Sequence, residues 1–400
     1  MNGGATNKTI DAVLDALGDL GQNIEAVYLY GSLSNGTYQP GQSDINLLIV
    51  LDEEESFHQA RKVLRPVWCN FGPVLKRTPL IATQSTLRRH LSFNPGLSRH
   101  LNEYGSLLAG HPCLPEPLTR DPIERLSEMA RIAMHGSAAI TPSLLSEREN
   151  AGTISCLRSL SRQLFDHEVS EDEHATALFS QIQADILSKM EQHPSLFWKD
   201  QPISGAPPLV KDLRGIYEHE NRLVLLLPDS GPEDVARRIK NIDWNAVAGR
   251  IISQYRGLWV TTAAQLRMIM LYDSPAAYQL GSYNHAWGLD PLVDLKVDAW
   301  RIFRNFGRSP STLLVDTLPQ AYTMSEDSDL AMMVHNLHNK LLNVQLKNEI
   351  YCRMQERPIA KPPGHLTDRD LPMEKRIDGI YNHLDWWSGH YANEMATAQT

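Results

Sequence analysis

The chain has 400 residues, of which 42% are hydrophobic and 21% are charged, and its formal net charge is −9. Such proportions are typical of a globular protein with two or three domains, and the acidic balance argues against a dedicated nucleic-acid binder, whose surface would be basic. No apolar run approaches the roughly 20 residues that span a bilayer. The first residues also lack the basic start and apolar centre of a signal peptide. We therefore expect a cytoplasmic protein with no membrane partner.

Apolar spacing predicts the first elements of the chain. Residues 8–20 carry apolar side chains at helical spacing and should form an amphipathic helix. Two short apolar runs, 26–30 and 45–51, are bounded by turn-forming residues and are predicted to be buried strands. An acidic first turn predicts a helix at 52–68, and residues 78–83 are the third strand candidate. The pattern indicates an α/β domain at the N-terminus.

Further helices are expected after the third strand, at 84–91 and at 95–110, the second of them ending at Gly110. Residues 112–122 contain four prolines and predict a domain boundary. Beyond this point helical periodicity prevails and no internal repeat is evident.

Three domains are predicted from these boundaries and from a second Pro/Gly-rich interval at 197–210. Residues 1–117 should form the α/β domain and residues 118–230 a helical domain. Residues 231–400 should form a second helical domain with an irregular C-terminal tail. The predicted fold class is thus a mixed sheet backed by helices, followed by a mostly α-helical region.

The segment 27–50, VYLYGSLSNGTYQPGQSDINLLIV, predicts a strand, a Gly-Ser turn, a polar loop and a second strand. Transfer of a phosphoryl or nucleotidyl group needs the triphosphate charge neutralised, which two divalent ions about 3.5–4 Å apart can do. Two carboxylates at i and i+2 of a strand point to one face and can hold such ions. A glycine turn on the neighbouring strand lets backbone amides approach phosphates closely.

Gly31-Ser32, followed after a polar loop by Ser43-Asp44-Ile45-Asn46, resembles the signature of the DNA polymerase beta-like nucleotidyltransferase superfamily. The resemblance is strongest to its small nucleotidyltransferases and to the aminoglycoside nucleotidyltransferases, and it covers about residues 8–112. It implies that Gly31 and Ser32, with Ser43 in the same motif, bind phosphates. It also implies that Asp44 and Asn46 occupy the catalytic positions, with Asp44 as the metal ligand.

The sequence departs from that signature where charge is needed. Asn46 occupies the position of the second carboxylate, and an amide brings no negative charge to Mg²⁺, which favours charged oxygen ligands. The family's third carboxylate usually comes from the strand after the next helix, yet no Asp or Glu occurs from Ser56 through Asn102. We therefore expect Mg²⁺ binding to be weak or absent.

The same acid-free window carries eight basic residues, for which two explanations remain open. They could lie on solvated helix faces, or they could form a cationic surface that holds polyphosphate without a metal. These residues are Arg61, Lys62, Arg65, Lys76, Arg77, Arg88, Arg89 and Arg99.

Other candidate groups are weaker. Asp290, Asp294 and Asp298 would share one helix face and could supply a base, although a helix cap at Asp290 and solvated aspartates after it are the more typical outcome. His335 and His338 on one predicted helix, and His383, Asp385 and His390 near the C-terminus, are expected to face solvent because no further ligand completes a metal site.

The sequence therefore predicts a nucleotidyltransferase-fold protein that binds a nucleotide or another phosphate-bearing small molecule, with catalysis lost or impaired. One alternative is an active enzyme that uses Mg²⁺ to transfer a nucleoside monophosphate to a hydroxyl of a small molecule or protein. Another is a non-catalytic protein-interaction module. Nucleic acid is not favoured as a partner.

Overall fold

The computed structural model describes the greater part of the chain. The described residues are 3–18, 23–36, 38, 43–52, 64–66, 68–70, 72, 75, 78–116, 126–127, 130–131, 175–192, 212–219, 222–245, 257–273, 283–292, 299–323, 327–364 and 371–399.

The chain divides into two compact units. Unit 1 comprises residues 1–119, 299–349 and 359–400, and unit 2 comprises residues 120–298 and 350–358. The chain passes from unit 1 to unit 2 between residues 119 and 120, and residues on both sides of position 230 belong to unit 2. The division into three domains stays a prediction.

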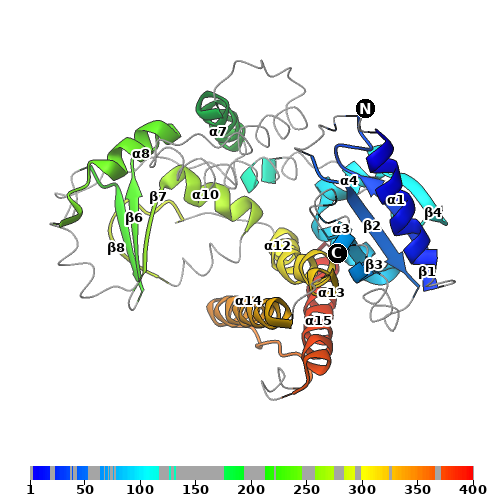
Figure 1. The fold of residues 1–400 in the computed structure, drawn as a ribbon. Helices are drawn as coiled ribbons and strands as arrows, with labels where there is room; N and C mark the ends of the chain where they lie inside the picture. The colour runs from blue at the N-terminus through cyan, green and yellow to red at the C-terminus, as the bar shows by residue number, and fades with distance from the viewer. Residues whose placement is uncertain are drawn as a thin grey trace. The chain divides into compact units, whose positions relative to one another are not determined.

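Unit 1 is built on a four-stranded mixed sheet with the order β3-β2-β1-β4 (Figure 1). The strands are β1 (Ile24–Tyr30), β2 (Asn46–Leu51), β3 (Leu80–Thr83) and β4 (Ser106–Gly110). Strand β1 pairs antiparallel with β2 and β4, and β2 pairs parallel with β3. Strands β2 and β3 are buried nearly throughout, which explains why their sequences are continuous apolar runs. The predicted N-terminal mixed sheet is confirmed.

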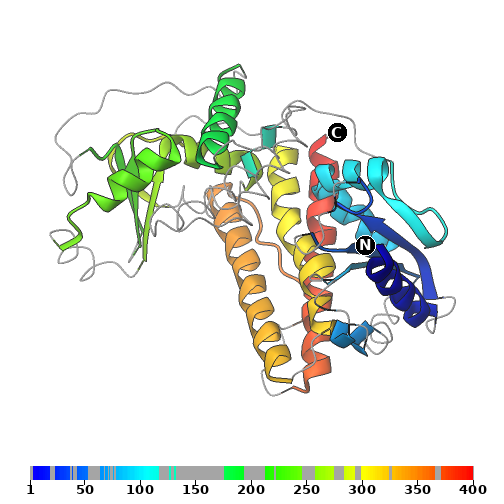
Figure 2. The same cartoon turned by 45° about the horizontal axis from the view of Figure 1, so that its top comes forward.

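Helices from both ends of the chain complete unit 1. From the N-terminal part come α1 (Gly3–Gly18), α3 (Gln84–Phe93) and α4 (Pro95–Tyr104). From the C-terminal part come α12 (Ala299–Thr312), its π-helical continuation η2 (Leu313–Thr317), α13 (Gln320–Thr323), α14 (Asp327–Met354) and α15 (Met373–Gln399). Helices α12 and α15 run side by side (Figure 2), and both contact α3. The mostly helical C-terminal region is confirmed for residues 299–399.

Two segments of unit 1 differ from their predicted form. The helix expected over 95–110 ends at Tyr104, and residues 106–110 form β4 instead. Gly105 allows the change, because a β-carbon there would lie 2.3 Å from the carbonyl oxygen of Leu101. The tail predicted to be irregular is helix α15, whose apolar side chains recur at helical spacing. Its buried residues include Ile377, Ile380, Leu384, Trp387 and Tyr391.

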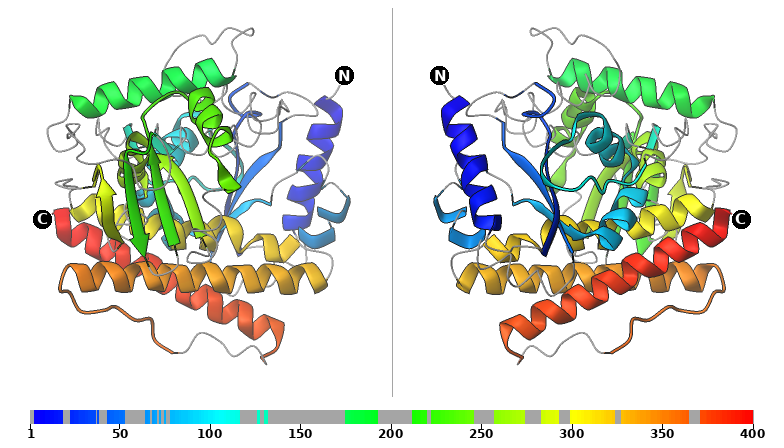
Figure 3. Two further views of the ribbon diagram at one scale, coloured as in Figure 1. Left: turned by 90° about the vertical axis from the view of Figure 1, so that its left-hand side faces the viewer. Right: turned by 90° about the vertical axis from the view of Figure 1, so that its right-hand side faces the viewer.

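Unit 2 contains a second sheet, where the sequence predicted mostly helical structure (Figure 3). Its elements are α7 (Ala175–Glu191), β5 (Gly215–His219), β6 (Arg222–Leu227), α8 (Pro232–Lys240), β7 (Gly257–Thr262), α10 (Ala263–Tyr272) and β8 (Asn284–Gly288). The strand order is β7-β6-β5-β8. The core of this sheet is formed by β6, which is buried from Leu223 to Leu227. The expectation of an all-helical segment at 118–230 is therefore corrected.

Candidate functional site

The predicted Gly-Ser turn lies at the end of β1, beside the beginning of β2. Tyr30, the last residue of β1, pairs with Asn46, the first residue of β2. The intervening chain turns at residues 31–36, and the carbonyl oxygen of Gly31 accepts hydrogen bonds from the Asn35 amide at 3.1 Å and the Ser34 hydroxyl at 3.3 Å. Strand pairing thus brings the two halves of the predicted motif together.

Gly31 has a positive φ of +82° and approaches Asn46 closely. A β-carbon at Gly31 would lie 2.5 Å from Nδ2 of Asn46, which is far inside van der Waals contact. Only glycine adopts this backbone conformation at no steric cost. The residue type at position 31 is therefore required by the backbone and by the neighbouring amide together.

Asn46 interacts directly with Asp44. Its Nδ2 donates a hydrogen bond of 3.1 Å to Oδ1 of Asp44. Both side chains are half-buried. The Asp44 carboxylate therefore has a hydrogen-bond partner within the protein and does not depend on solvent alone. A carboxylate at position 46 could not donate this bond and would instead repel Asp44 unless a cation lay between them.

The two serines of the motif are both sheltered from solvent. Ser43 is half-buried directly before Asp44. The hydroxyl oxygen of Ser32 is inaccessible to solvent and has no hydrogen-bond partner among the described residues. A buried hydroxyl without a partner costs free energy, so a ligand that hydrogen bonds to it would recover that cost.

His100 of α4 is a site residue that sequence reasoning missed. Its Nε2 accepts a hydrogen bond of 3.1 Å from the backbone amide of Gly31. Burial lowers the pKa of His100, with the charge of Glu103 acting in the opposite direction, so the ring favours the neutral form that can accept this bond. The histidine lies 69 residues from Gly31, and no local pattern in the sequence signals the contact.

The chain position beside Asn46, just before β3, also lacks a carboxylate. In the parallel pairing of β2 with β3, Leu48 lies opposite Leu80, so two residues earlier Asn46 corresponds to Thr78. Threonine there provides a neutral hydroxyl. Within the described part of the chain, no cluster of three or more His, Cys, Asp or Glu side chains could hold a metal ion.

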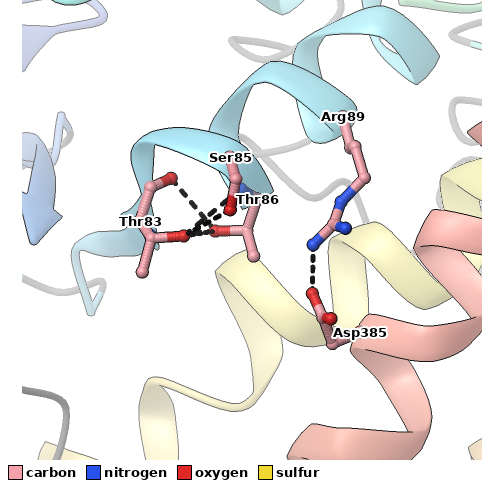
Figure 4. A network of polar contacts seen from close by, with 5 residues as sticks. All are labelled: Thr83, Ser85, Thr86, Arg89 and Asp385. Atoms are coloured by element: carbon pink, nitrogen blue, oxygen red, sulfur yellow. Dashed lines mark hydrogen bonds and ion pairs between the residues drawn. The ribbon is translucent and has the colours of Figure 1, made fainter. Parts of the chain in front are cut away.

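Arg89 is one of the eight basic residues, and its structural role is clear. Arg89 of α3 forms an ion pair with Asp385 of α15, further along the helix from the hydrogen-bonded hydroxyls of Thr83, Ser85 and Thr86 (Figure 4). Arg88, the preceding residue, is exposed. Arg89 therefore links α3 to α15, while the exposure of Arg88 agrees with a solvated helix face. Residues 61, 62, 76 and 77 lie outside the described residues.

The weaker candidates have structural explanations or lie outside the described residues. Asp290 accepts hydrogen bonds from the Tyr217 hydroxyl at 2.7 Å and the Leu292 amide at 3.1 Å, so it closes a turn. Residues 294 and 298 are not among those described. His335 is exposed, as expected, and hydrogen bonds with Asn339, whereas His383 is buried, contrary to expectation.

Comparison with known proteins agrees with the geometry of unit 1. Residues 10–88 match the family model of the nucleotidyltransferase domain. This span begins in α1, contains the Gly-Ser turn and both candidate ligands, and ends within α3. The chain therefore contains a nucleotidyltransferase domain. Neither a curated protein nor a solved structure gave a significant match. Among the described helices, none is long and apolar enough to cross a bilayer.

Proposed function

We propose that this protein binds a nucleotide, or another phosphate-bearing small molecule, at the Gly31–Asn46 site without depending on a divalent metal, and that nucleotidyl transfer is lost or strongly impaired. The observation that carries the proposal is the hydrogen bond from Asn46 Nδ2 to Asp44 Oδ1. The amide occupies the second ligand position and satisfies the remaining carboxylate, which a metal ion would do in a working site.

The turn itself supports ligand binding. Gly31 brings the backbone close to β2, and the buried Ser32 hydroxyl, which has no hydrogen-bond partner in the described part of the chain, would gain one from a phosphate oxygen once ligand binding opens the turn. Hydrogen bonds from hydroxyl and amide groups can hold an anion without a cation, because glycine turns form concave arrays of N–H donors. The absence of acids over residues 56–102 removes repulsion against such an anion.

Calorimetric titration of the full chain tests the proposal. ATP, GTP, CTP and UTP would each be titrated with Mg²⁺ and again with EDTA. We expect binding of at least one nucleotide with a Kd that changes less than about threefold when Mg²⁺ is removed. Affinity that falls more than tenfold without Mg²⁺ would support the alternative of an active, metal-dependent transferase. A complete lack of binding would support the alternative of an interaction module.

Ser32→Ala locates the binding site. Removing one hydrogen bond to a charged group costs about 1.5–3 kcal/mol, so the nucleotide Kd should rise at least about tenfold. The thermal midpoint of the free protein should stay within about 2 °C, because the hydroxyl has no partner in the described part of the chain. Ser106→Ala makes the same chemical change at an exposed position of β4 and should leave binding unchanged.

A further inference from the structure

The sheets of the two units have the same topology. In each, a central antiparallel pair is flanked by a parallel strand on one side and an antiparallel strand on the other. The strands also follow one another along the chain in the same order, since β3-β2-β1-β4 and β7-β6-β5-β8 differ only by four in each label. Strand order alone is a coarse likeness, so the register of the strands is the stronger test.

The register agrees residue by residue. Ala26 of β1 pairs with Val50 and with Gly110, and Gly215 of β5 pairs with Leu226 and with Gly288. Aligning Ala26 with Gly215 brings Tyr28 onto Tyr217. The pairing with the outer antiparallel strand is irregular at the same point in both sheets, between residues 27 and 28 and between residues 216 and 217.

The outer antiparallel strands, β4 and β8, each end in a glycine with a positive φ. Gly110 has φ +80° and Gly288 has φ +84°. A β-carbon would lie 2.1 Å from the Glu25 carbonyl oxygen in the first case and 2.3 Å from the Arg214 carbonyl oxygen in the second. The next residue donates its amide to that same oxygen in both units, at 2.8 Å and 2.7 Å.

Each of the aligned tyrosines hydrogen bonds with the chain that follows its outer antiparallel strand. The hydroxyl of Tyr28 accepts a hydrogen bond of 2.8 Å from the amide of Cys113, three residues after Gly110. The hydroxyl of Tyr217 donates a hydrogen bond of 2.7 Å to Asp290, two residues after Gly288. Each tyrosine thus anchors the chain that leaves its sheet.

The helices that follow the parallel strands also correspond. Thr83 ends β3 and caps α3, and Thr262 ends β7 and caps α10, each through a reciprocal capping box with the residue three positions later. Both helices have ten residues, and their C-terminal caps adopt nearly the same backbone angles: φ −127° and ψ 68° at Asn94, and φ −136° and ψ 60° at Asp273. Topology, register and both caps therefore agree between the units.

The units differ where unit 1 carries its site. In unit 1 the central strands are connected by the 15 residues 31–45, which contain the Gly-Ser turn and Asp44. In unit 2 the same strands are connected by two residues, 220 and 221. Arg222 pairs with His219 as Asn46 pairs with Tyr30, so an arginine aligns with the second ligand position.

We infer that unit 2 is a second nucleotidyltransferase core in which a short hairpin replaces the nucleotide site, so that each chain binds one nucleotide and binds it in unit 1. The count of one site rests on the function proposed above. The duplicated core does not, because it follows from the strand registers and caps alone.

Engineered disulfides test the core of unit 2 without any nucleotide. Glu218 pairs with Asn284 across β5 and β8, although the two residues are 66 positions apart. Directly opposed residues have Cα atoms about 4.5–5.5 Å apart, within the range that a disulfide spans. We expect Glu218→Cys with Asn284→Cys to cross-link on mild oxidation, as identified by peptide mass spectrometry.

The matched control keeps Glu218→Cys and moves the second cysteine two positions along β8, to the exposed Ala286. It should cross-link at least fivefold less, because diagonal neighbours are about 7–8 Å apart. Equal cross-linking in both variants, or none in either, would overturn the inferred register and with it the second core.

Photolabelling of the full chain with an azido-ATP counts the sites. If the variant with Glu218→Cys and Asn284→Cys cross-links as expected, the full inference also requires that the labelled peptides of the wild-type chain all come from unit 1. It requires as well a calorimetric stoichiometry of one nucleotide per chain. Saturable labelling in unit 2, or a stoichiometry of two, would overturn the assignment of a single site. If no nucleotide binds, the proposed function fails and the single site with it, while the disulfide result still decides the second core.

Discussion

Asn46, the first residue of β2, donates a hydrogen bond to Asp44, two residues before the strand begins, with 3.1 Å between Nδ2 and Oδ1. Side chains two positions apart in extended chain lie on one face, and the contact agrees with that spacing. The same spacing would place two carboxylates together if position 46 were acidic. The residue type at position 46 therefore determines whether the Asp44 carboxylate is satisfied by a neighbouring amide or requires a cation.

Asn46→Asp should convert the site toward metal binding. Two carboxylates side by side, without the amide donor, repel each other and should cost the metal-free protein about 1 kcal/mol. Mg²⁺ or Mn²⁺ would relieve that repulsion, so we expect millimolar metal to raise the thermal midpoint of the variant by several degrees and that of the wild type by less than one degree. Differential scanning fluorimetry measures both.

Asn336→Asp is the control for this change, because it introduces the same charge at an exposed position of α14. Its midpoint should not respond to the metals. An equal metal response in the Asn46→Asp and Asn336→Asp proteins would contradict the role assigned to position 46.

Two glycines of the same turn separate backbone strain from close approach. Gly31 and Gly36 have nearly equal φ values of +82° and +79°, but a β-carbon at Gly36 meets nothing within 4 Å. Gly36→Ala should therefore cost only the left-handed strain, about 1–2 kcal/mol. Gly31→Ala should cost at least ~1 kcal/mol more, because the methyl group must displace Asn46.

Urea unfolding of the two alanine variants measures this difference. Gly31→Ala should also abolish nucleotide binding, whereas Gly36→Ala should retain it. Equal losses of stability in the two proteins would show that the Asn46 contact is unimportant.

Local patterns in the sequence were sufficient for the strands that carry the motif. The runs 26–30 and 45–51 and the candidate at 78–83 correspond to β1, β2 and β3, because buried strands have continuous apolar sequences. Strand β4 was missed because its residues are exposed or half-buried and directly follow a helix. Strand β6 was missed although residues 223–227 form an apolar run between Arg222 and Pro228.

The candidate site was predictable only as far as its local motif. Gly31, Ser32, Ser43, Asp44 and Asn46 were named from the resemblance of their motif to a known family, and their roles stay predictions. The structure brings Gly31, Asp44 and Asn46 together at the start of β2. Contacts such as that between His100 and Gly31 depend on how α4 packs against β1, which no window of the sequence encodes. The internal likeness of the two sheets was hidden for the same reason. What the units share is the backbone register and a few residues at caps and turns.

The ion pair between Arg89 and Asp385 predicts a measurable coupling between α3 and α15. Both side chains are about a quarter exposed, so the pair should contribute roughly 1 kcal/mol, more than a fully solvated pair. A double-mutant cycle with Arg89→Ala and Asp385→Ala, followed by urea unfolding, should give a coupling free energy of about 0.5–1.5 kcal/mol. The neighbouring exposed residue offers a control, since Arg88→Ala should show no coupling to Asp385→Ala. Coupling below ~0.2 kcal/mol in the Arg89 cycle would leave the pair without a role in stability.

His90 predicts a pH dependence of stability in unit 1. It is buried in α3, 3.3 Å from the hydroxyl of Ser311, and burial is the main reason why its pKa falls to about 4, with the charge of Arg308 acting in the same direction. An unfolded histidine titrates near 6.5. Between these two values the unfolded chain binds a proton that the folded protein does not. The stabilisation is therefore complete above about pH 6.5 and is lost as the pH falls toward 4, by ~3 kcal/mol in total.

His90→Gln isolates this contribution, because the amide can still hydrogen bond with Ser311 but does not titrate. Urea unfolding at pH 7.5, 6.0 and 4.5 should show the wild type losing more stability than the variant at each step down, with the difference reaching at least ~2 kcal/mol at pH 4.5. Carboxylates titrate in both proteins and cancel in this comparison. His335→Gln, at an exposed position, should follow the wild-type profile. Parallel profiles for the His90→Gln and wild-type proteins would mean that the pKa of His90 is not lowered in the folded protein.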